Sequence, residues 1–262
     1  MNVMSLLYHD VVEPGRDDES GFPGGAAGRY KLVWAAFEEH VHALARSPGR
    51  PPLGIADLVE HPEPRAWALT FDDGGASALP VGEMLAQRGW PAHFYVTVGR
   101  IGTPGFVDEE AIRALRDLGH VVGSHTCTHP ERMSACSFPD LVLEWQESVD
   151  RLGEILGEPV SVASVPGGYY SPKVARAAAS AGIKALFTSE PTASIRRIDG
   201  CLVFGRYVVK KHVSATTASA LASGARAPRY RQLAEWNAIK AAKIAGGSAY
   251  PRIRRLVLDR RP

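Results

Sequence analysis

This chain of 262 residues lacks features that would place it in several protein classes. Its three cysteines, Cys127, Cys136 and Cys201, form no CxxC pair, so no disulfide framework is indicated and a reducing compartment is favoured. The formal net charge of +2 gives no reason to expect nucleic acid or another polyanion as a partner. No segment reaches the roughly 18 apolar residues that cross a bilayer. The start, MNVMSLLYHDVVEPG, lacks a basic n-region and a cleavage site, so a cytoplasmic location is expected.

The composition is that of an ordinary globular protein. Hydrophobic residues make up 45% of the chain and charged residues 22%. The length is sufficient for a sizeable core without disulfides. No internal repeat and no long linker divides the chain, so a single domain over residues 1–262 is predicted.

Short apolar runs alternate with helical patterns along most of the chain. Strand–helix alternation with short loops is typical of a parallel α/β sheet, and six or seven such units suit a barrel better than an open sheet. The predicted strands are 3–8, 66–71, 92–98, 120–123, 160–165, 184–188 and 202–209. The predicted helices are 34–47, 78–88, 108–118, 138–156 and 172–181, with two more near the C-terminus.

Two adjacent aspartates, Asp72 and Asp73, follow the predicted strand at 66–71 and precede Gly74 and Gly75. Neighbouring side chains normally point to opposite faces of a strand, but the glycines let the backbone turn so that both carboxylates can face one pocket. A polar turn at a strand end would explain the pair equally well. The carboxyl ends of strands are where α/β barrels place catalytic groups, which favours a functional role.

His125 and His129 stand four residues apart, again just past a predicted strand. This spacing suits two imidazoles on one metal ion when the backbone makes a helical turn, whereas a lone histidine would indicate little. The hydroxyls of Ser124, Thr126 and Thr128 could fix the ring tautomers. Together with one aspartate, the histidines predict a divalent metal site with open positions for water and substrate.

The segments Thr70-Phe71-Asp72-Asp73-Gly74 and His125-Thr126-Cys127-Thr128-His129 resemble the first two motifs of the polysaccharide deacetylase family, the NodB-homology group of carbohydrate esterases. The likeness covers roughly residues 66–190 and includes the runs GWPAHFYV and GHVVG that precede the histidine motif. The order and spacing of the two motifs make chance a poor explanation.

The resemblance implies a distorted (β/α)-barrel of about seven strands and removal of acetyl groups from an N- or O-acetylated sugar. It also implies that Asp73, His125 and His129 ligate the metal and that Asp72 is the catalytic base. Zn²⁺ is the ion expected first, with Co²⁺, Ni²⁺ and Mn²⁺ as alternatives. The implied partner is an acetylated saccharide.

The third motif of the family is usually Arg-x-Pro-x-Gly, but here Ser164 occupies the position of the arginine. Without that cation, Asp72 lacks a charge that would lower its pKa and fix its rotamer. Arg206, in the predicted last strand, could supply the charge from another direction. The motif's glycines allow close backbone approach, so Gly168 and Tyr169 are predicted near the substrate with an N–H as oxyanion donor. A tight turn would explain the glycines equally well.

The general acid of the family is usually a histidine near the last strand, two residues after a leucine. His212 is the local candidate, although the leucine is absent and the flanking lysines suggest a solvated loop. His9, after the first predicted strand, is an alternative, and so is the absence of any histidine acid. An amine leaving group needs an acid more than an alkoxide does, so N- and O-deacetylation both stay open.

Residues 226–262 contain ten arginines or lysines against two acidic residues and are predicted to form a basic helical extension. A solvated helix and tail is the simpler interpretation. The alternative is a peripheral membrane contact with anionic lipid headgroups or with a lipid-linked sugar carrier.

The sequence therefore predicts a metal-dependent hydrolase that removes acetyl groups from an N-acetylated polysaccharide, oligosaccharide or lipid-linked precursor. The alternatives are a hydrolase for a non-sugar amide and a catalytically weak barrel that binds sugar. The acceptor sugar, its chain length, the native metal and the oligomeric state are not fixed by the sequence.

Overall fold

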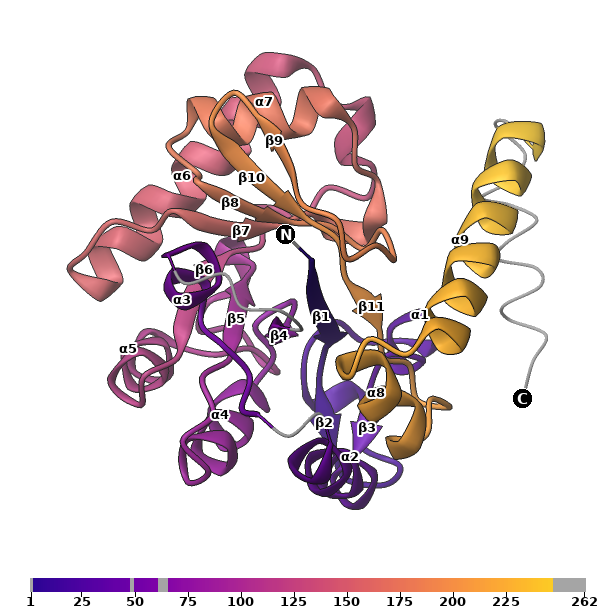
Figure 1. Ribbon diagram of the computed structural model, residues 1–262. Helices are drawn as coiled ribbons and strands as arrows, with labels where there is room; N and C mark the ends of the chain where they lie inside the picture. Colours follow the sequence, from indigo (N-terminus) through magenta and orange to yellow (C-terminus); the bar gives the residue numbers. More distant parts are fainter. Residues whose placement is uncertain (1, 48–49, 61–65, 247–262) are drawn as a thin grey trace.

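A curled parallel sheet with helices around its outside forms the centre of the computed structural model, which describes residues 2–47, 50–60 and 66–246 (Figure 1). Nine strands follow one another in the order β11-β1-β4-β5-β6-β7-β8-β10-β9, and all are parallel to their neighbours except β9. The predicted α/β barrel class is confirmed. Hydrogen bonds between the described strands leave β11 and β9 as edges, so the barrel is open on that side.

The strands alternate with helices along the chain in the way that produces a parallel sheet. The strands of the large sheet are β1 (Val3–Tyr8), β4 (Ala66–Phe71), β5 (His93–Val96), β6 (Val121–Ser124), β7 (Val162–Ser164), β8 (Ala185–Phe187), β9 (Arg196–Ile198), β10 (Cys201–Phe204) and β11 (Tyr207–Val208). A separate pair is formed by β2 (Val11–Val12) and β3 (Leu32–Val33).

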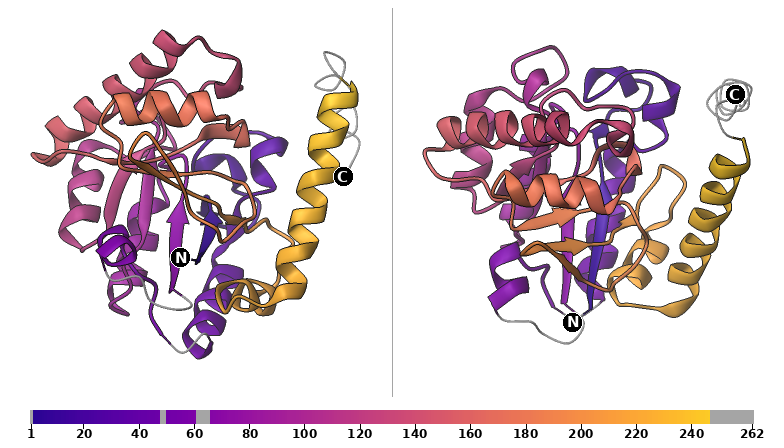
Figure 2. Two further views of the ribbon diagram at one scale, coloured as in Figure 1. Left: turned by 45° about the horizontal axis from the view of Figure 1, so that its top comes forward. Right: turned by 90° about the horizontal axis from the view of Figure 1, so that it is seen from above.

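Helices α4, α5, α6 and α7 lie around the outer face of the sheet in Figures 1 and 2, whereas α9 stands to one side. Two of the helices have clear caps: the Asp108 carboxylate caps α5, and Gly157 ends α6 in the left-handed conformation. The helices are α1 (Gly25–Gly28), α2 (Trp34–Arg46), α3 (Ile55–Glu60), α4 (Ala78–Ala86), α5 (Glu109–Asp117), α6 (Phe138–Leu156), α7 (Pro172–Ser180), α8 (Ala215–Ala222) and α9 (Arg226–Gly246).

Apolar residues are buried on both faces of the sheet. The larger cluster lies between the strands and the surrounding helices and includes Trp67 and Trp145. A smaller cluster fills the inner face, where Leu58 of α3 packs with Val3 and Ala66 from the first residues of their strands. Helix α3 therefore covers the amino end of the barrel interior, and polar chemistry is left to the opposite, carboxyl end.

The prediction of one continuous last strand at 202–209 was wrong. The segment is divided into β10 and β11, with Gly205 and Arg206 between them. A Cβ atom on Gly205 would lie 2.4 Å from the carbonyl oxygen of Thr192 and 2.5 Å from that of Glu190, so only glycine fits. The break matters for the site because it directs the Arg206 side chain into the barrel.

Helix α9 begins the predicted basic extension and is attached to the edge strand β11. The Gln232 side-chain amide accepts from Val208 N at 3.1 Å and donates to Val208 O at 3.0 Å. Arg229 Nε donates to the Tyr207 hydroxyl at 2.7 Å. Residues 247–262 of the predicted extension lie outside the described residues. No described helix combines the length and hydropathy that a membrane span requires.

Candidate metal centre and catalytic carboxylate

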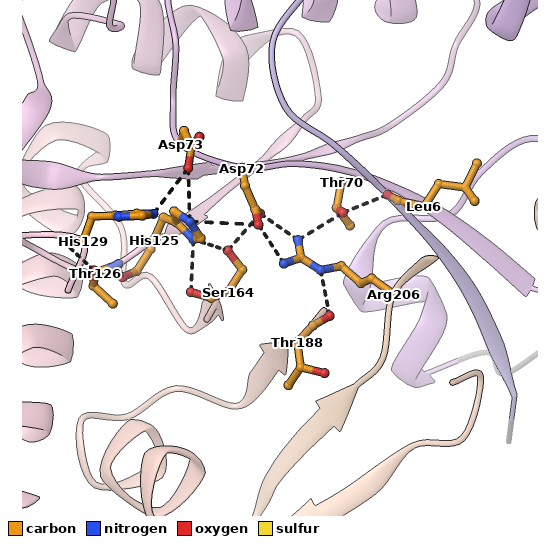
Figure 3. A network of polar contacts seen from close by, with 11 residues as sticks. Leu6, Thr70, Asp72, Asp73, His125, Thr126, His129, Ser164, Thr188 and Arg206 are labelled. Carbon is orange, nitrogen blue, oxygen red and sulfur yellow. Dashed lines mark hydrogen bonds and ion pairs between the residues drawn. The ribbon is translucent and has the colours of Figure 1, made fainter. Parts of the chain in front are cut away.

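The polar cluster lies where β4, β6 and β7 end, at the carboxyl edge of the sheet (Figure 3). Asp72 and Asp73 follow β4, His125 follows β6, and Ser164 is the last residue of β7. Gly74 turns the chain after the aspartates with φ of +75°, and a Cβ atom there would lie 3.1 Å from the Val96 backbone. Parallel strands that end at one edge thus bring together residues separated by up to 92 positions in sequence.

Asp73, His125 and His129 form a group that could hold a metal ion. Asp73 Oδ1 lies 3.3 Å from His125 Nε2 and 3.6 Å from His129 Nε2, and the three potential ligand atoms all lie within 4.8 Å of one another. Nitrogen and carboxylate donors converging in this way suit a divalent cation such as Zn²⁺. The arrangement matches the predicted ligand set, but the roles themselves stay a prediction.

The backbone is strained at this group. Of the four described non-glycine residues with positive φ, three lie here: Asp73 at 80°, Thr126 at 68° and His129 at 58°. Left-handed backbone is unfavourable for such residues, above all for a β-branched threonine, and it persists only where surrounding contacts hold it. Concentration of this strain at the three-residue group favours a functional role over an incidental turn.

The electrostatics of the group fit cation binding. Burial by itself would raise the pKa of Asp73, but a hydrogen bond from His125 and the charges of nearby histidines hold it well below its ordinary value. Burial lowers the pKa of His129 to about 4, and the neighbouring His125 adds to the effect. An ionised aspartate beside a neutral imidazole is the state that a metal requires of these ligands.

Arg206 forms a bidentate ion pair with Asp72. Its Nη1 and Nη2 atoms donate to Asp72 Oδ1 and Oδ2, each at 2.7 Å, and the arginine side chain is completely buried. Nε donates to Thr188 O at 3.0 Å, and Nη1 also reaches Thr70 Oγ1 at 3.2 Å. The structure therefore places the Arg206 guanidinium against Asp72, although Ser164 occupies the position where the resembled motif usually has arginine.

The pair determines the charge state of Asp72. Burial would raise the pKa of this carboxyl, but the charge of Arg206, followed by His125 and the Arg206 hydrogen bonds, holds it below its ordinary value. Asp72 Oδ2 lies 4.0 Å from His125 Nε2, next to the candidate metal group. Asp72 is thus an ionised carboxylate beside the group but separate from its three ligand residues.

The prediction that the hydroxyls of Ser124, Thr126 and Thr128 fix the imidazole tautomers was wrong, because these hydroxyls bond to other groups. Ser124 Oγ accepts from Thr126 N, and Thr126 Oγ1 accepts from His129 N, so both hold the loop backbone. Thr128 donates to Glu144. The imidazole of His125 is contacted instead by Ser164. In the sequence, Ser164 was noted only because it stands where the third motif usually has arginine.

Glu144 of α6 fixes the histidine loop from outside. Its Oε2 accepts from Cys127 N at 3.0 Å and Thr128 N at 2.9 Å, while Oε1 accepts from Thr128 Oγ1 at 2.5 Å. These residues lie between His125 and His129, so the carboxylate holds the segment that sets the spacing of the two imidazoles. Glu144 lies within the helix predicted at 138–156, but the sequence gave no signal for this contact.

Glu144→Ala is therefore expected to weaken divalent-metal binding by about 10-fold, since loss of an outer hydrogen bond usually costs that much. Competition with a chromogenic chelator measures the dissociation constant. Gln146→Ala, on an exposed position of the same helix, is the matched control and should leave the affinity unchanged. Equal affinities of the Glu144 variant and the control would contradict the role.

The two candidate acids lie in different environments. His212 is exposed in a turn between β11 and α8, and no described hydrogen bond or ion pair joins it to the carboxylates. His9 follows β1, contacts the Tyr30 ring in a tilted arrangement with ring centroids 4.8 Å apart, and has a buried Nδ1 without a described hydrogen-bond partner. Its charge acts on Asp72, behind the larger effects of burial, Arg206 and His125. The structure thus brings His9, and not His212, to the cluster.

The predicted substrate residues Gly168 and Tyr169 follow β7 in a tight turn, with Gly167 and Gly168 at φ of +61° and +69°. A Cβ atom on Gly168 would lie 3.2 Å from the indole of Trp236, so α9 packs directly on this turn. The Tyr169 ring lies under the Arg132 guanidinium, 5.5 Å from its centroid. Their predicted contact with substrate, and an N–H acting as oxyanion donor, stay predictions.

The fold and site define an α/β barrel with a candidate Asp–His–His metal group and an arginine-bound carboxylate at its carboxyl edge. Residues 60–186 match the family described as polysaccharide deacetylase. Through this region the chain is similar to the polysaccharide deacetylase family. It is 34% identical over 125 residues to a chitooligosaccharide deacetylase of Sinorhizobium fredii. That match covers 46% of this chain and 55% of the relative, so the chain spans about half of the relative's length.

Solved structures of similar fold extend the comparison to most of the chain. A deacetylase of Streptococcus pyogenes, PplD, covers 82% of this chain and 95% of its own at a TM-score of 0.67 and 18% identity. A polysaccharide deacetylase of Bacillus cereus matches 84% of this chain and 69% of its own chain, with a TM-score of 0.68 and 22% sequence identity. IcaB of Ammonifex degensii matches 85% of this chain and 97% of its own chain, with a TM-score of 0.66 and 21% sequence identity. At these identities the likeness shows the fold.

Proposed function

We propose that this protein is a divalent-metal-dependent hydrolase that removes acetyl groups from an N-acetylated saccharide. The observation that carries the proposal is the buried Asp72–Arg206 pair, which keeps an ionised carboxylate beside the Asp73–His125–His129 group. The family match and the chitooligosaccharide deacetylase relative support a saccharide substrate.

Asp73, His125 and His129 would hold the metal, since their donor atoms converge and the strained backbone at Asp73, Thr126 and His129 indicates a fixed arrangement. A divalent cation bound there supplies a Lewis acid for the acetyl carbonyl and lowers the pKa of water. Zn²⁺ is the ion we expect first, with Co²⁺, Ni²⁺ and Mn²⁺ as alternatives.

Asp72 acts as general base in this proposal. Its carboxylate is ionised because Arg206 lies against both oxygens, and it is free to accept a proton because the three candidate ligands do not include it. Arg206 holds the carboxylate in one orientation, and Thr188 O and Thr70 Oγ1 hold the guanidinium. The base is thus fixed before substrate arrives, which is what efficient proton transfer requires.

His9 is the residue we propose to protonate the departing sugar amine. The next residue, Asp10, is buried and its Oδ1 accepts from Ser20 Oγ at 2.7 Å and Ser77 Oγ at 3.2 Å. The Ser77 contact joins the segment after β1 to the loop after β4, and the charge of His9 is among the effects that lower the pKa of Asp73.

His9→Asn is accordingly expected to lower kcat on an N-acetylated oligosaccharide by about 10²-fold, and less on an O-acetyl ester, whose alkoxide depends less on an acid. His212→Asn should change neither rate by more than about twofold, because its imidazole is exposed away from the cluster. Steady-state assays of both variants on both substrates test this. A large loss in His212→Asn with an active His9→Asn would reverse the assignment.

Metal analysis of purified protein combined with an acetate-release screen tests the function. We expect about one divalent ion per chain and acetate from N-acetylated oligosaccharides. Release of product from small cyclic amides without acetate from any saccharide would favour the non-sugar amidase. A metal-loaded protein that binds saccharides but releases no acetate over a broad panel would favour the sugar-binding alternative.

A further inference from the structure

Ser164 occupies a position between the candidate metal ligand His125 and the carboxylate Asp72. Its Oγ lies 2.6 Å from His125 Nδ1 and donates to Asp72 Oδ1 at 3.0 Å (Figure 3). Its carbonyl oxygen lies 3.2 Å from the same Nδ1. Ser164 is completely buried in β7, so both contacts are shielded from water.

The number of hydrogens available fixes the direction of these bonds. Both carboxylate oxygens of Asp72 accept hydrogen bonds from Arg206 at 2.7 Å, so Asp72 is the acceptor towards Ser164 as well. A serine hydroxyl has one hydrogen, and here it is used on Asp72 Oδ1. The short contact with His125 therefore requires Nδ1 to carry a hydrogen and to donate it to Ser164 Oγ.

The opposite arrangement would leave two repulsive contacts. If Ser164 donated to His125, its lone pairs would face the Asp72 carboxylate at 3.0 Å. The Nδ1 lone pair would also face the Ser164 carbonyl oxygen at 3.2 Å. Buried lone pairs without a hydrogen between them are costly, so the contacts around Ser164 favour a hydrogen on Nδ1.

We propose that Ser164 is a positioning residue that places the hydrogen of His125 on Nδ1, directs Nε2 towards Asp73, and couples the metal ligand to Asp72. The inference rests on the metal site of the proposed function. With Nδ1 donating, the Nε2 lone pair points at the Asp73 carboxylate 3.3 Å away, an arrangement that a bound cation completes.

The same contacts explain why a serine at this position is compatible with a charged Asp72. Arg206 approaches from the β10–β11 break and neutralises both carboxylate oxygens. The end of β7 is then free for a small hydroxyl that reaches the carboxylate and the imidazole at once. An arginine at this position could supply no acceptor for His125 Nδ1 from its side chain, because a guanidinium only donates.

Two variants test the proposal through metal affinity, which needs no substrate. Ser164→Ala removes the hydroxyl, and Ser164→Cys keeps nearly the same volume with a much weaker hydrogen-bonding group. Both are expected to raise the Kd for Zn²⁺ or Co²⁺ by about 10-fold while the fold is retained by circular dichroism. The Co²⁺ absorption spectrum should change in both variants, since it reports the geometry of the ligands.

A double-mutant cycle separates coupling from a structural role. Asp72→Asn is expected to change the Kd for the metal by a smaller factor in the Ser164→Ala background than in wild type. The two factors should differ by about twofold or more. Unchanged affinity in both Ser164 variants, or single effects on Kd that simply multiply, would overturn the inference alone. Failure of the wild-type protein to bind a divalent metal would overturn the proposed function and this inference together.

Discussion

Asp72→Asn is expected to lower kcat for acetate release by about 10²- to 10⁴-fold, the range that a lost general base usually costs. The amide cannot take a proton from water, although its shape is nearly that of the carboxylate. Metal content should stay close to that of wild type, because Asp72 is not one of the three converging ligand residues. Steady-state kinetics with metal analysis on the same preparation measure both quantities.

The adjacent residue provides the matched control. Asp73→Asn is expected to lose the metal as well as the activity, since Asp73 Oδ1 is the atom that both imidazoles face. The two aspartates are neighbours in sequence, so a general disturbance of this turn would affect both variants alike. Loss of metal in Asp72→Asn, or retention of metal in Asp73→Asn, would contradict the division of roles.

Arg206→Met is expected to lower the free energy of unfolding by about 3–5 kcal/mol at neutral pH, because it leaves the buried Asp72 charge without its partner. Urea denaturation of the variant and the wild type measures the difference. Arg231→Met removes an exposed arginine paired with Glu235 and should cost less than about 1 kcal/mol. The double variant Arg206→Met with Asp72→Asn should recover part of the lost stability.

The pH dependence of the Arg206 contribution has a definite sign. In the folded protein the pKa of Asp72 lies below its unfolded value, so the pair stabilises the fold at neutral pH and loses this effect as pH falls through the folded pKa. The stability difference between wild type and Arg206→Met should therefore shrink on acidification. In the variant, burial raises the pKa of Asp72, and the acidic limb of kcat/KM should move to higher pH. A difference in stability that is constant with pH would exclude the ion pair as its source.

Much of the fold could be predicted from local patterns. Strand β1 and helix α6 begin and end at the predicted residues, because β1 is a short apolar run and α6 has a helical apolar period with capping residues. The break between β10 and β11 was missed, since the run at 202–209 is apolar enough to pass for one strand. What divides it is the closeness of the Glu190 and Thr192 carbonyls to Gly205, a contact between distant segments.

Some residues of the candidate site could likewise be identified from local sequence patterns, and others could not. Asp73, His125 and His129 could be proposed as ligands because their spacing and strand-end positions are local properties. Arg206 could be named only as a hypothesis from the missing arginine, and the position near the last strand favoured His212 over His9 as the acid. The structure distinguishes them, because His212 is exposed whereas the half-buried His9 is among the charged groups that act on Asp72.

The sequence by itself determined which residues can bind a metal cation, because residue type and short sequence spacing are enough to identify candidate ligands. Only the tertiary structure decided which residues control the carboxylate. Arg206 and Ser164 meet Asp72 from 134 and 92 residues away. Such contacts depend on the order of strands around the barrel and on one break between β10 and β11. No local pattern encodes either of them.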